Sequence, residues 1–336
     1  MTEGDSSILR ACVIGLGTMG RNHVRVWDTE VDGVDLVGVA DPDPTALRRA
    51  TDGRAARGYL DADEMLSAES PDLVSIVAPT SAHLPTTLAA LAAGAHVLVE
   101  KPIAATRGEA EQMIAAAANA GRLLSVGHIE RFNPVIRELQ RRLAAGEVGR
   151  VFEIRATRLG PFPSRIRDVG VVVDLAPHDL DIMRYLLCSD PIRLYAETEQ
   201  RIHTDHEDIF VGIMKFANGA VGVLDINWLT PTKHRTLTVT GERGMFTADY
   251  LAQELIFWGN PADASVAEGQ PVSIAVERRE PLIVELGEFA RAVRNGGPPP
   301  VDPHEAMVAL LLARAMVESA ETSKVINGAA LQAVLA

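Results

Sequence analysis

Short apolar runs alternate with amphipathic segments through the first third of the chain. The runs predict strands at residues 10–15, 34–40, 73–78, 96–100 and 123–127. Segments with helical periodicity lie between several of them, at about 19–27, 84–93 and 107–120. This alternation is typical of a parallel sheet with helices on both faces. We therefore predict an α/β protein whose first domain, residues 1–127, has a doubly wound parallel sheet.

From residue 151 onward the pattern changes to longer strands rich in β-branched and aromatic residues. Two of them, 208–216 and 220–228, flank Asn218-Gly219, a dipeptide suited to a two-residue type I′ turn in which both residues have positive φ. Further strands are predicted at 236–240, 244–249 and 254–258, and helices at about 174–187, 282–294 and 304–323. These elements predict an α+β domain over residues 128–336 with a large, mostly antiparallel open sheet.

The charge balance narrows the choice of partners. The chain has 45 acidic and 32 basic residues and a formal net charge of −13, whereas nucleic acid or an anionic membrane calls for a basic surface. We expect neither as a partner. Two cysteines, Cys12 and Cys188, are too few for a disulfide framework or a cysteine metal cage. With no signal-peptide pattern and no long uninterrupted apolar helix, the sequence predicts a cytoplasmic protein.

A glycine-rich segment, GLGTMG, follows the first predicted strand and opens the first predicted helix. Its glycines have the G-x-G-x-x-G spacing. The first, Gly15, makes a tight turn, the second, Gly17, lets the backbone approach a pyrophosphate, and the third, Gly20, lets the helix pack on the strand. Together with Thr18 and Met19, they predict a dinucleotide site in a Rossmann domain.

Asp41 ends the second predicted strand, about 20 residues after Gly20, where a carboxylate can accept hydrogen bonds from the adenosine ribose hydroxyls. Its charge would repel a 2′-phosphate, and Pro42 and Asp43 supply no cation to bind one. NAD is therefore expected rather than NADP. The alternative is that Asp41 only starts the turn before Pro42.

Glu100-Lys101-Pro102 ends the strand at 96–100, at the carboxyl edge where ligands of doubly wound sheets bind. Beside a nicotinamide, the Lys101 amine could bind or deprotonate a substrate hydroxyl. The spacing alone fits an ordinary surface lysine as well.

Asp174 and His178 lie four residues apart around Pro177, which fits best near a helix start. On one face of a first turn, the carboxylate and the imidazole could share a substrate hydroxyl, with His178 taking the proton. The alternative is a helix capped by Asp174 with His178 in the core. A metal site is not expected, because no third strong ligand has suitable spacing.

The order of these motifs resembles the glucose-fructose oxidoreductase, inositol dehydrogenase and rhizopine-catabolism (Gfo/Idh/MocA) family over nearly the whole chain. The resemblance implies a Rossmann domain followed by an α+β domain whose open sheet packs against a sister subunit, giving a homodimer or homotetramer. It also implies that Lys101 hydrogen-bonds the reacting hydroxyl, that His178 is the general base and that Asp174 orients the substrate. Which of Lys101 and His178 takes the proton varies across the family.

The same resemblance extends to the cofactor loop. It places Pro79, Thr80 and His83, in the segment VAPTSAH, beside the cofactor, and Glu100 near the nicotinamide ribose.

Two further segments are similar to one branch of the family, the UDP-N-acetylglucosamine 3-dehydrogenases. They are GHIERFNP at 127–134 and GPFPSRIRDVG at 160–170. Four of their side chains could donate hydrogen bonds to sugar or diphosphate oxygens: Arg131, Asn133, Arg165 and Arg167. The expected substrate is thus a sugar or nucleotide sugar oxidised at its 3-hydroxyl. The arginines could instead lie in surface loops or a subunit interface.

Three alternatives remain open. An aminoglycoside intermediate in antibiotic biosynthesis could be oxidised at the 3-hydroxyl of its amino sugar before transamination, and an acidic protein would suit such a cation. Plain inositol or glucose oxidation is the second. The third belongs to a different class: an NAD-binding sensor that has lost the chemistry, which the presence of both Lys101 and His178 disfavours.

Overall fold

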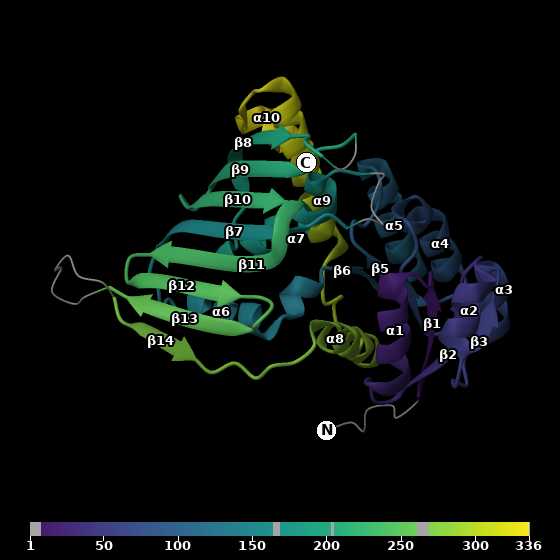
Figure 1. The fold of residues 1–336 in the computed structure, drawn as a ribbon. Helices are drawn as coiled ribbons and strands as arrows, with labels where there is room; N and C mark the ends of the chain where they lie inside the picture. The colour runs from purple at the N-terminus through teal and green to yellow at the C-terminus, as the bar shows by residue number, and fades with distance from the viewer. Residues whose placement is uncertain (1–7, 164–168, 203–204, 261–268, 336) are drawn as a thin grey trace. The chain divides into compact units, whose positions relative to one another are not determined.

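The computed structural model describes residues 8–163, 169–202, 205–260 and 269–335 (Figure 1). The chain divides into two compact units. Met1–Ile129 and Glu280–Met307 form unit 1, and Glu130–Arg279 and Val308–Ala336 form unit 2.

Unit 1 contains a six-stranded parallel sheet of strand order β3-β2-β1-β4-β5-β6. Its strands are β1 (Leu9–Ile14), β2 (Val34–Ala40), β3 (Arg57–Tyr59), β4 (Leu73–Ile76), β5 (His96–Glu100) and β6 (Leu124–Gly127). Its helices are α1 (Thr18–Thr29), α2 (Pro44–Thr51), α3 (Ala62–Glu69), α4 (Thr80–Ala92), α5 (Arg107–Ala120) and α8 (Pro281–Asn295). The order reverses between β1 and β4, and in doubly wound sheets ligands bind at that point, outside the carboxyl ends of the strands.

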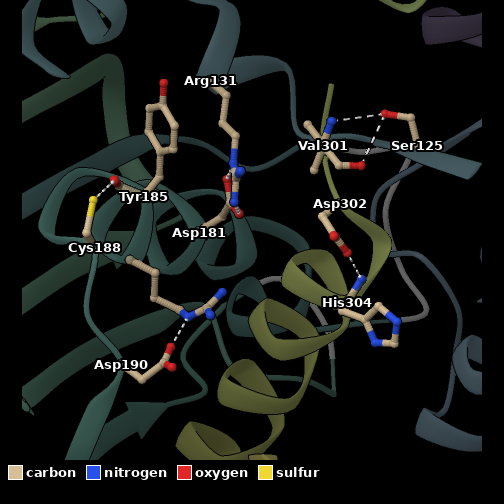
Figure 2. A network of polar contacts seen from close by, with 10 residues as sticks. Ser125, Arg131, Asp181, Tyr185, Cys188, Asp190, Val301, Asp302 and His304 are labelled. Atoms are coloured by element: carbon tan, nitrogen blue, oxygen red, sulfur yellow. Dashed lines mark hydrogen bonds and ion pairs between the residues drawn. The ribbon is translucent and has the colours of Figure 1, made fainter. Parts of the chain in front are cut away.

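The sequence prediction of two uninterrupted domains differs from this division, because residues 280–307 return to unit 1. The apolar face of α8 explains the return: Leu286 and Phe289 are fully buried in the core cluster that also contains Val24 and Trp27 of α1. Close by in the chain, the Val301 amide donates to the Ser125 hydroxyl at 3.2 Å (Figure 2).

Unit 2 contains a nine-stranded sheet of order β14-β13-β12-β11-β7-β10-β9-β8-β15, antiparallel except for the β7–β10 pair. Its strands are β7 (Val151–Pro161), β8 (Pro191–Glu199), β9 (Ile209–Phe216), β10 (Val221–Asn227), β11 (Leu229–Gly241), β12 (Gly244–Asp249), β13 (Glu254–Gly259), β14 (Pro271–Ile274) and β15 (Ile326–Asn327). Its helices are α6 (Pro134–Ala144), α7 (Val171–Leu187) and α10 (Gly328–Leu335), while η1 (Ile129–Phe132) and α9 (Pro303–Thr322) begin in unit 1 and continue into unit 2.

The core of unit 2 lies between one face of this sheet and helices α6, α7 and α9 (Figure 1). Side chains alternate along each central strand. On β9, Phe210 and Met214 point into the core, whereas Val211 and Ile213 are 43% and 50% exposed on the other face. This period of two places one row of side chains of each central strand on the face that the helices cover.

The β9–β10 hairpin forms as predicted, but its turn differs from the predicted type I′. Only Gly219 has positive φ, at 93°, and the amide of Phe216 bonds the carbonyl of Ala220 at 2.9 Å. The loop therefore has three residues and ends with glycine in a left-handed conformation, the geometry usual for three-residue hairpins. Asn218 instead accepts the Ala220 amide with its side chain, at 3.0 Å.

Two general features bear on the sequence predictions. Within the described residues, no helix is long and apolar enough to cross a membrane. Cys12 is buried in unit 1, and Cys188 lies exposed at the end of α7; both are free thiols.

Candidate dinucleotide and substrate sites

The glycine-rich turn joins β1 to α1, and two of its glycines are required by packing of the chain itself. Gly15 has φ +93°, and a Cβ there would lie 2.6 Å from the Val77 carbonyl oxygen. A Cβ on Gly20 would lie 1.9 Å from the Gly15 carbonyl oxygen. Any side chain at either position would displace backbone.

Gly17 is different, because a Cβ there would meet no atom within 4 Å. Gly17 is the N-cap of α1, and no side chain caps this helix. The amides of the first turn, which includes Thr18 and Met19, are therefore available to an external acceptor, and the helix dipole favours an anion there. Open space beside uncapped amides fits the close approach of a dinucleotide pyrophosphate.

Asp41 follows β2 at the same edge of the sheet. Its Oδ2 accepts the Leu16 amide at 2.7 Å and its Oδ1 accepts the Asp43 amide at 2.8 Å. The carboxylate thus ties the end of β2 to the glycine-rich turn and also starts the turn before α2, as the alternative interpretation expects, while ribose binding stays a prediction. Each oxygen retains a lone pair and the side chain is half-exposed, which leaves acceptor capacity for ribose hydroxyls.

The ends of β4 and β5 complete this edge of unit 1. Pro79 is the N-cap of α4 and Thr80 is its first residue. Lys101 directly follows β5 and is half-buried. The chain thus places the glycine-rich turn, Asp41, the β4–α4 loop and Lys101 at the carboxyl ends of adjacent parallel strands.

His83 on α4 links two of these strand ends. Its ring is 1% exposed. Nε2 lies 3.0 Å from the Ala78 carbonyl oxygen and Nδ1 lies 3.0 Å from the carbonyl oxygen of Pro102. Burial lowers the pKa of His83 below its usual value, although these carbonyl contacts act in the opposite direction. The ring connects the segment after β4 to the segment that carries Lys101.

Sequence reasoning missed a second buried histidine in unit 1, His23 on α1. Its Nε2 lies 3.1 Å from Oε1 of Glu100, and its ring is fully buried. Glu100 also packs against the backbone at Gly127, where a Cβ would lie 2.9 Å from the carboxylate. The only signal in the sequence was a histidine on the helix that follows the glycine motif.

In unit 2, α7 carries Asp174 and His178. The helix begins at Val171 with Gly170 as N-cap, three residues earlier than predicted. Asp174 is therefore in the first turn and does not cap the helix, and Pro177 lies inside the helix. Both side chains are half-buried, and their spacing of four residues puts them on one helical face.

Directly after His178, and about 100° around α7 from it, Asp179 belongs to a buried charge cluster that the sequence did not predict. Arg158 of β7 donates two hydrogen bonds to Asp179, at 2.7 and 2.9 Å, and a third to Glu130 at 3.1 Å. Burial opposes the charge of Arg158, but the two carboxylates outweigh it and raise the pKa of Arg158. Arg235 of β11 is also close, 3.8 Å from Glu130. The signal available in the sequence was a charged residue, Arg158, that continues the period of two set by Ile154 and Ala156.

The residues expected to bind sugar have other surroundings. Arg131 is buried and donates to both oxygens of Asp181, at 2.7 and 2.5 Å (Figure 2). Asn133 is the N-cap of α6; its Oδ1 accepts the Val135 amide and its Nδ2 donates to the Tyr250 carbonyl. Both side chains thus have bonds within the protein, and sugar binding by Arg131 and Asn133 stays a prediction.

The other two predicted sugar ligands, Arg165 and Arg167, lie outside the described residues. Among the residues that are described, no group of three or more histidine, cysteine or acidic side chains is arranged to bind a metal ion.

Two family models match most of the chain. Residues 9–128 match the oxidoreductase family with an NAD-binding Rossmann fold, and residues 136–247 match the GFO/IDH/MocA C-terminal domain.

Relatives of known activity match over similar lengths. UDP-N-acetylglucosamine 3-dehydrogenase from Acidithiobacillus ferrooxidans is 29% identical over 85% of this chain and 88% of that protein. A solved structure of that enzyme has a TM-score of 0.84, with 27% identity over 94% of this chain and 98% of the other. D-apiose dehydrogenase from Paraburkholderia graminis is 30% identical over 96% of this chain and 91% of its own length. Myo-inositol 2-dehydrogenase from Thermotoga maritima is 25% identical over 94% and 97%.

Proposed function

Because the chain belongs to the GFO/IDH/MocA oxidoreductase family and has an NAD-binding Rossmann domain, we propose that it oxidises a secondary hydroxyl of a sugar or polyol. One observation carries the proposal: unit 1 has a glycine turn open to a dinucleotide, and unit 2 has an acid and an imidazole on one face of α7. NAD, when bound, accepts the hydride from the substrate carbon. The protein must bind and orient the alcohol and remove its proton.

In this mechanism Lys101 hydrogen-bonds the reacting oxygen, and His178 takes the hydroxyl proton as general base. Asp174, one turn before His178, accepts a hydrogen bond from a neighbouring hydroxyl and so orients the ring. The reaction balances with either Lys101 or His178 as the base, because either neutral side chain can accept the single proton released. A pH-rate profile of each variant separates the two assignments.

The proposed substrate is UDP-N-acetylglucosamine, oxidised at its 3-hydroxyl to the 3-keto sugar. The support is similarity to UDP-N-acetylglucosamine 3-dehydrogenase in sequence and in structure. Myo-inositol is the second candidate, because a myo-inositol 2-dehydrogenase aligns over a larger share of the chain at somewhat lower identity.

A substrate panel tests the proposal. The protein is mixed with NAD and, separately, with UDP-N-acetylglucosamine, myo-inositol, glucose and an aminoglycoside pseudo-disaccharide, and NADH absorbance is followed. Growth of the signal with one sugar or polyol is the expected result. If NAD raises the unfolding temperature while no member of the panel yields NADH, the protein is a dinucleotide-binding sensor and the proposal is wrong.

We also propose that the sheet of unit 2 forms a homo-oligomer through its face opposite α6 and α7. Apolar side chains gather there, including Val223 of β10 directly across from Ile213 of β9. Burying such a face against a second copy removes apolar surface from water. Analytical ultracentrifugation tests the assembly: Ile213→Lys should shift it toward monomer.

We also propose a cytoplasmic location, with which two free thiols and a diffusible nicotinamide cofactor agree.

A further inference from the structure

Two arginines lie directly opposite each other on neighbouring strands of unit 2. Arg235 of β11 pairs in register with Arg158 of β7. Each stands two residues from a core residue of its own strand, Leu237 on β11 and Ala156 on β7, so both lie on the face of the sheet that α7 covers. Like charges opposite each other on adjacent strands are unfavourable. Other groups must therefore compensate the charges of both arginines.

The buried charge of Arg158 is compensated, because its guanidinium donates to Asp179 and Glu130. The charge of Arg235 is not compensated by such hydrogen bonds. Its nearest carboxylate oxygen, Oε1 of Glu130, is 3.8 Å away and already accepts from Arg158. Among the described residues the Arg235 guanidinium makes no hydrogen bond, although its side chain is only 34% exposed. A half-buried cation with five unused donors is costly unless a further group accepts from it.

The surroundings of Arg235 point to what that group is. The side chain lies on the sheet face that α7 covers, opposite Arg158, whose guanidinium donates to Asp179 of that helix. Burial and Arg158 lower the pKa of Arg235, while Glu130, Asp179 and Asp174 act in the opposite direction. An arginine nevertheless stays charged at neutral pH. Its donors are therefore available beside the helix face that we assign to the substrate.

We propose that Arg235 is a specificity-determining residue that donates hydrogen bonds to an oxygen acceptor of the substrate, close to the carbon that is oxidised. The acceptor is an amide carbonyl, a hydroxyl or a carboxylate. A guanidinium excludes an ammonium at the same position, since like charges repel and neither group can accept. The inference rests on the proposed function and narrows it: an N-acetylated or hydroxylated ring is accepted, and the corresponding amino sugar is rejected.

The experiment compares ligand pairs that differ at one substituent. The probes are UDP-N-acetylglucosamine with UDP-glucosamine, and myo-inositol with an amino-inositol. The proteins are wild type, Arg235→Gln, Arg235→Lys and the control Arg193→Gln, which changes an exposed arginine on β8. Two readouts are measured for each pair: affinity for the NADH complex by NADH fluorescence, and kcat and KM with NAD.

Loss of a charge-assisted hydrogen bond predicts that Arg235→Gln weakens binding of the acceptor-bearing probe by about tenfold to a hundredfold. The preference over the amino probe should shrink by a similar factor, NAD affinity should stay unchanged, and Arg235→Lys should restore part of the loss. Arg193→Gln should match wild type. Unfolding temperatures within a few degrees of wild type confirm that each variant is folded.

The two possible failures are distinguishable. If wild type oxidises a probe and Arg235→Gln binds both members of the pair as wild type does, the inference is overturned while the proposed function stands. If wild type binds a probe without oxidising it, the proposed function fails, and the affinity ratio still decides the role of Arg235. If wild type binds no probe, both are overturned.

Discussion

The guanidinium of Arg158 and the carboxylate of Asp179 form a bidentate ion pair in which the side chains are 3% and 2% exposed. The pair joins the middle of the sheet in unit 2 to α7. Because the pair is buried, either partner left without the other carries an uncompensated charge, and the orientation of α7 depends on the pair.

We therefore expect Asp179→Ala to lower the free energy of unfolding by about 3–5 kcal/mol. Glu153→Ala is the matched control, because Glu153 pairs with Arg155 on the same strand at 3.2 Å in an exposed position, where such pairs contribute about 0–1 kcal/mol. Urea denaturation measures both. Equal effects of the two substitutions would show that the buried pair does not stabilise α7.

The glycines of the dinucleotide turn should separate binding from folding. Gly17→Ala adds a methyl group into open space in the protein, so we expect its unfolding temperature to stay near that of wild type while NAD affinity falls by tenfold or more, about 1.4 kcal/mol. Gly20→Ala places a Cβ against the Gly15 carbonyl and should destabilise unit 1 itself. Thermal unfolding with and without NAD distinguishes the two, and unchanged NAD affinity in Gly17→Ala would place the pyrophosphate elsewhere.

Asp41 should determine the choice between NAD and NADP. Asp41→Asn keeps an acceptor for the Leu16 amide but removes the charge that repels a 2′-phosphate. We expect the ratio of kcat/KM for NAD to that for NADP to fall by about tenfold or more. Asp43→Asn, which leaves the carboxylate of Asp41 in place, is the control. An unchanged ratio in Asp41→Asn would mean that another group reads the ribose.

Lys101 and His178 should act on chemistry and not on cofactor binding. Lys101→Ala and His178→Ala are each expected to lower kcat by about 10²–10⁴-fold, the range for loss of general acid–base catalysis, with NAD affinity nearly unchanged. Fluorescence titration gives the affinity and steady-state kinetics gives kcat. Rates close to wild type in both variants would exclude the proposed roles.

His83 makes the stability of unit 1 depend on pH. Because burial lowers the pKa of His83 below 6.5, the unfolded chain takes up a proton more readily than the folded chain. The stabilisation from the neutral ring is therefore complete above about pH 6.5 and is lost as the pH falls below it. The difference in unfolding free energy between wild type and His83→Gln should shrink between about pH 8 and pH 5. His304→Gln, at an exposed position, is the control; a pH-independent difference for His83→Gln would contradict the expectation.

Local patterns in the sequence were sufficient for much of the fold. Five strands of unit 1, the glycine turn after β1 and the β9–β10 hairpin were predicted, because each depends on residues that are near one another in the chain. The same holds for Asp174 and His178, which share a helix face by spacing alone. The short strand β3 has no strong local signal and was not predicted. The turn at Asn218-Gly219 was predicted with the wrong type, because this dipeptide also fits a three-residue loop that ends in a left-handed glycine.

Contacts between distant segments decided the rest. Arg131 and Asp181, and Arg158 and Glu130, pair only because the sheet brings η1, β7 and α7 together, and the return of residues 280–307 to unit 1 depends on which core buries the apolar face of α8. The identity of a charged residue does not reveal whether its side chain contacts a ligand, another residue or water. Burial and the choice of partner arise when the elements pack, and they distinguish the internally bonded Arg131 from Arg235, whose donors remain available.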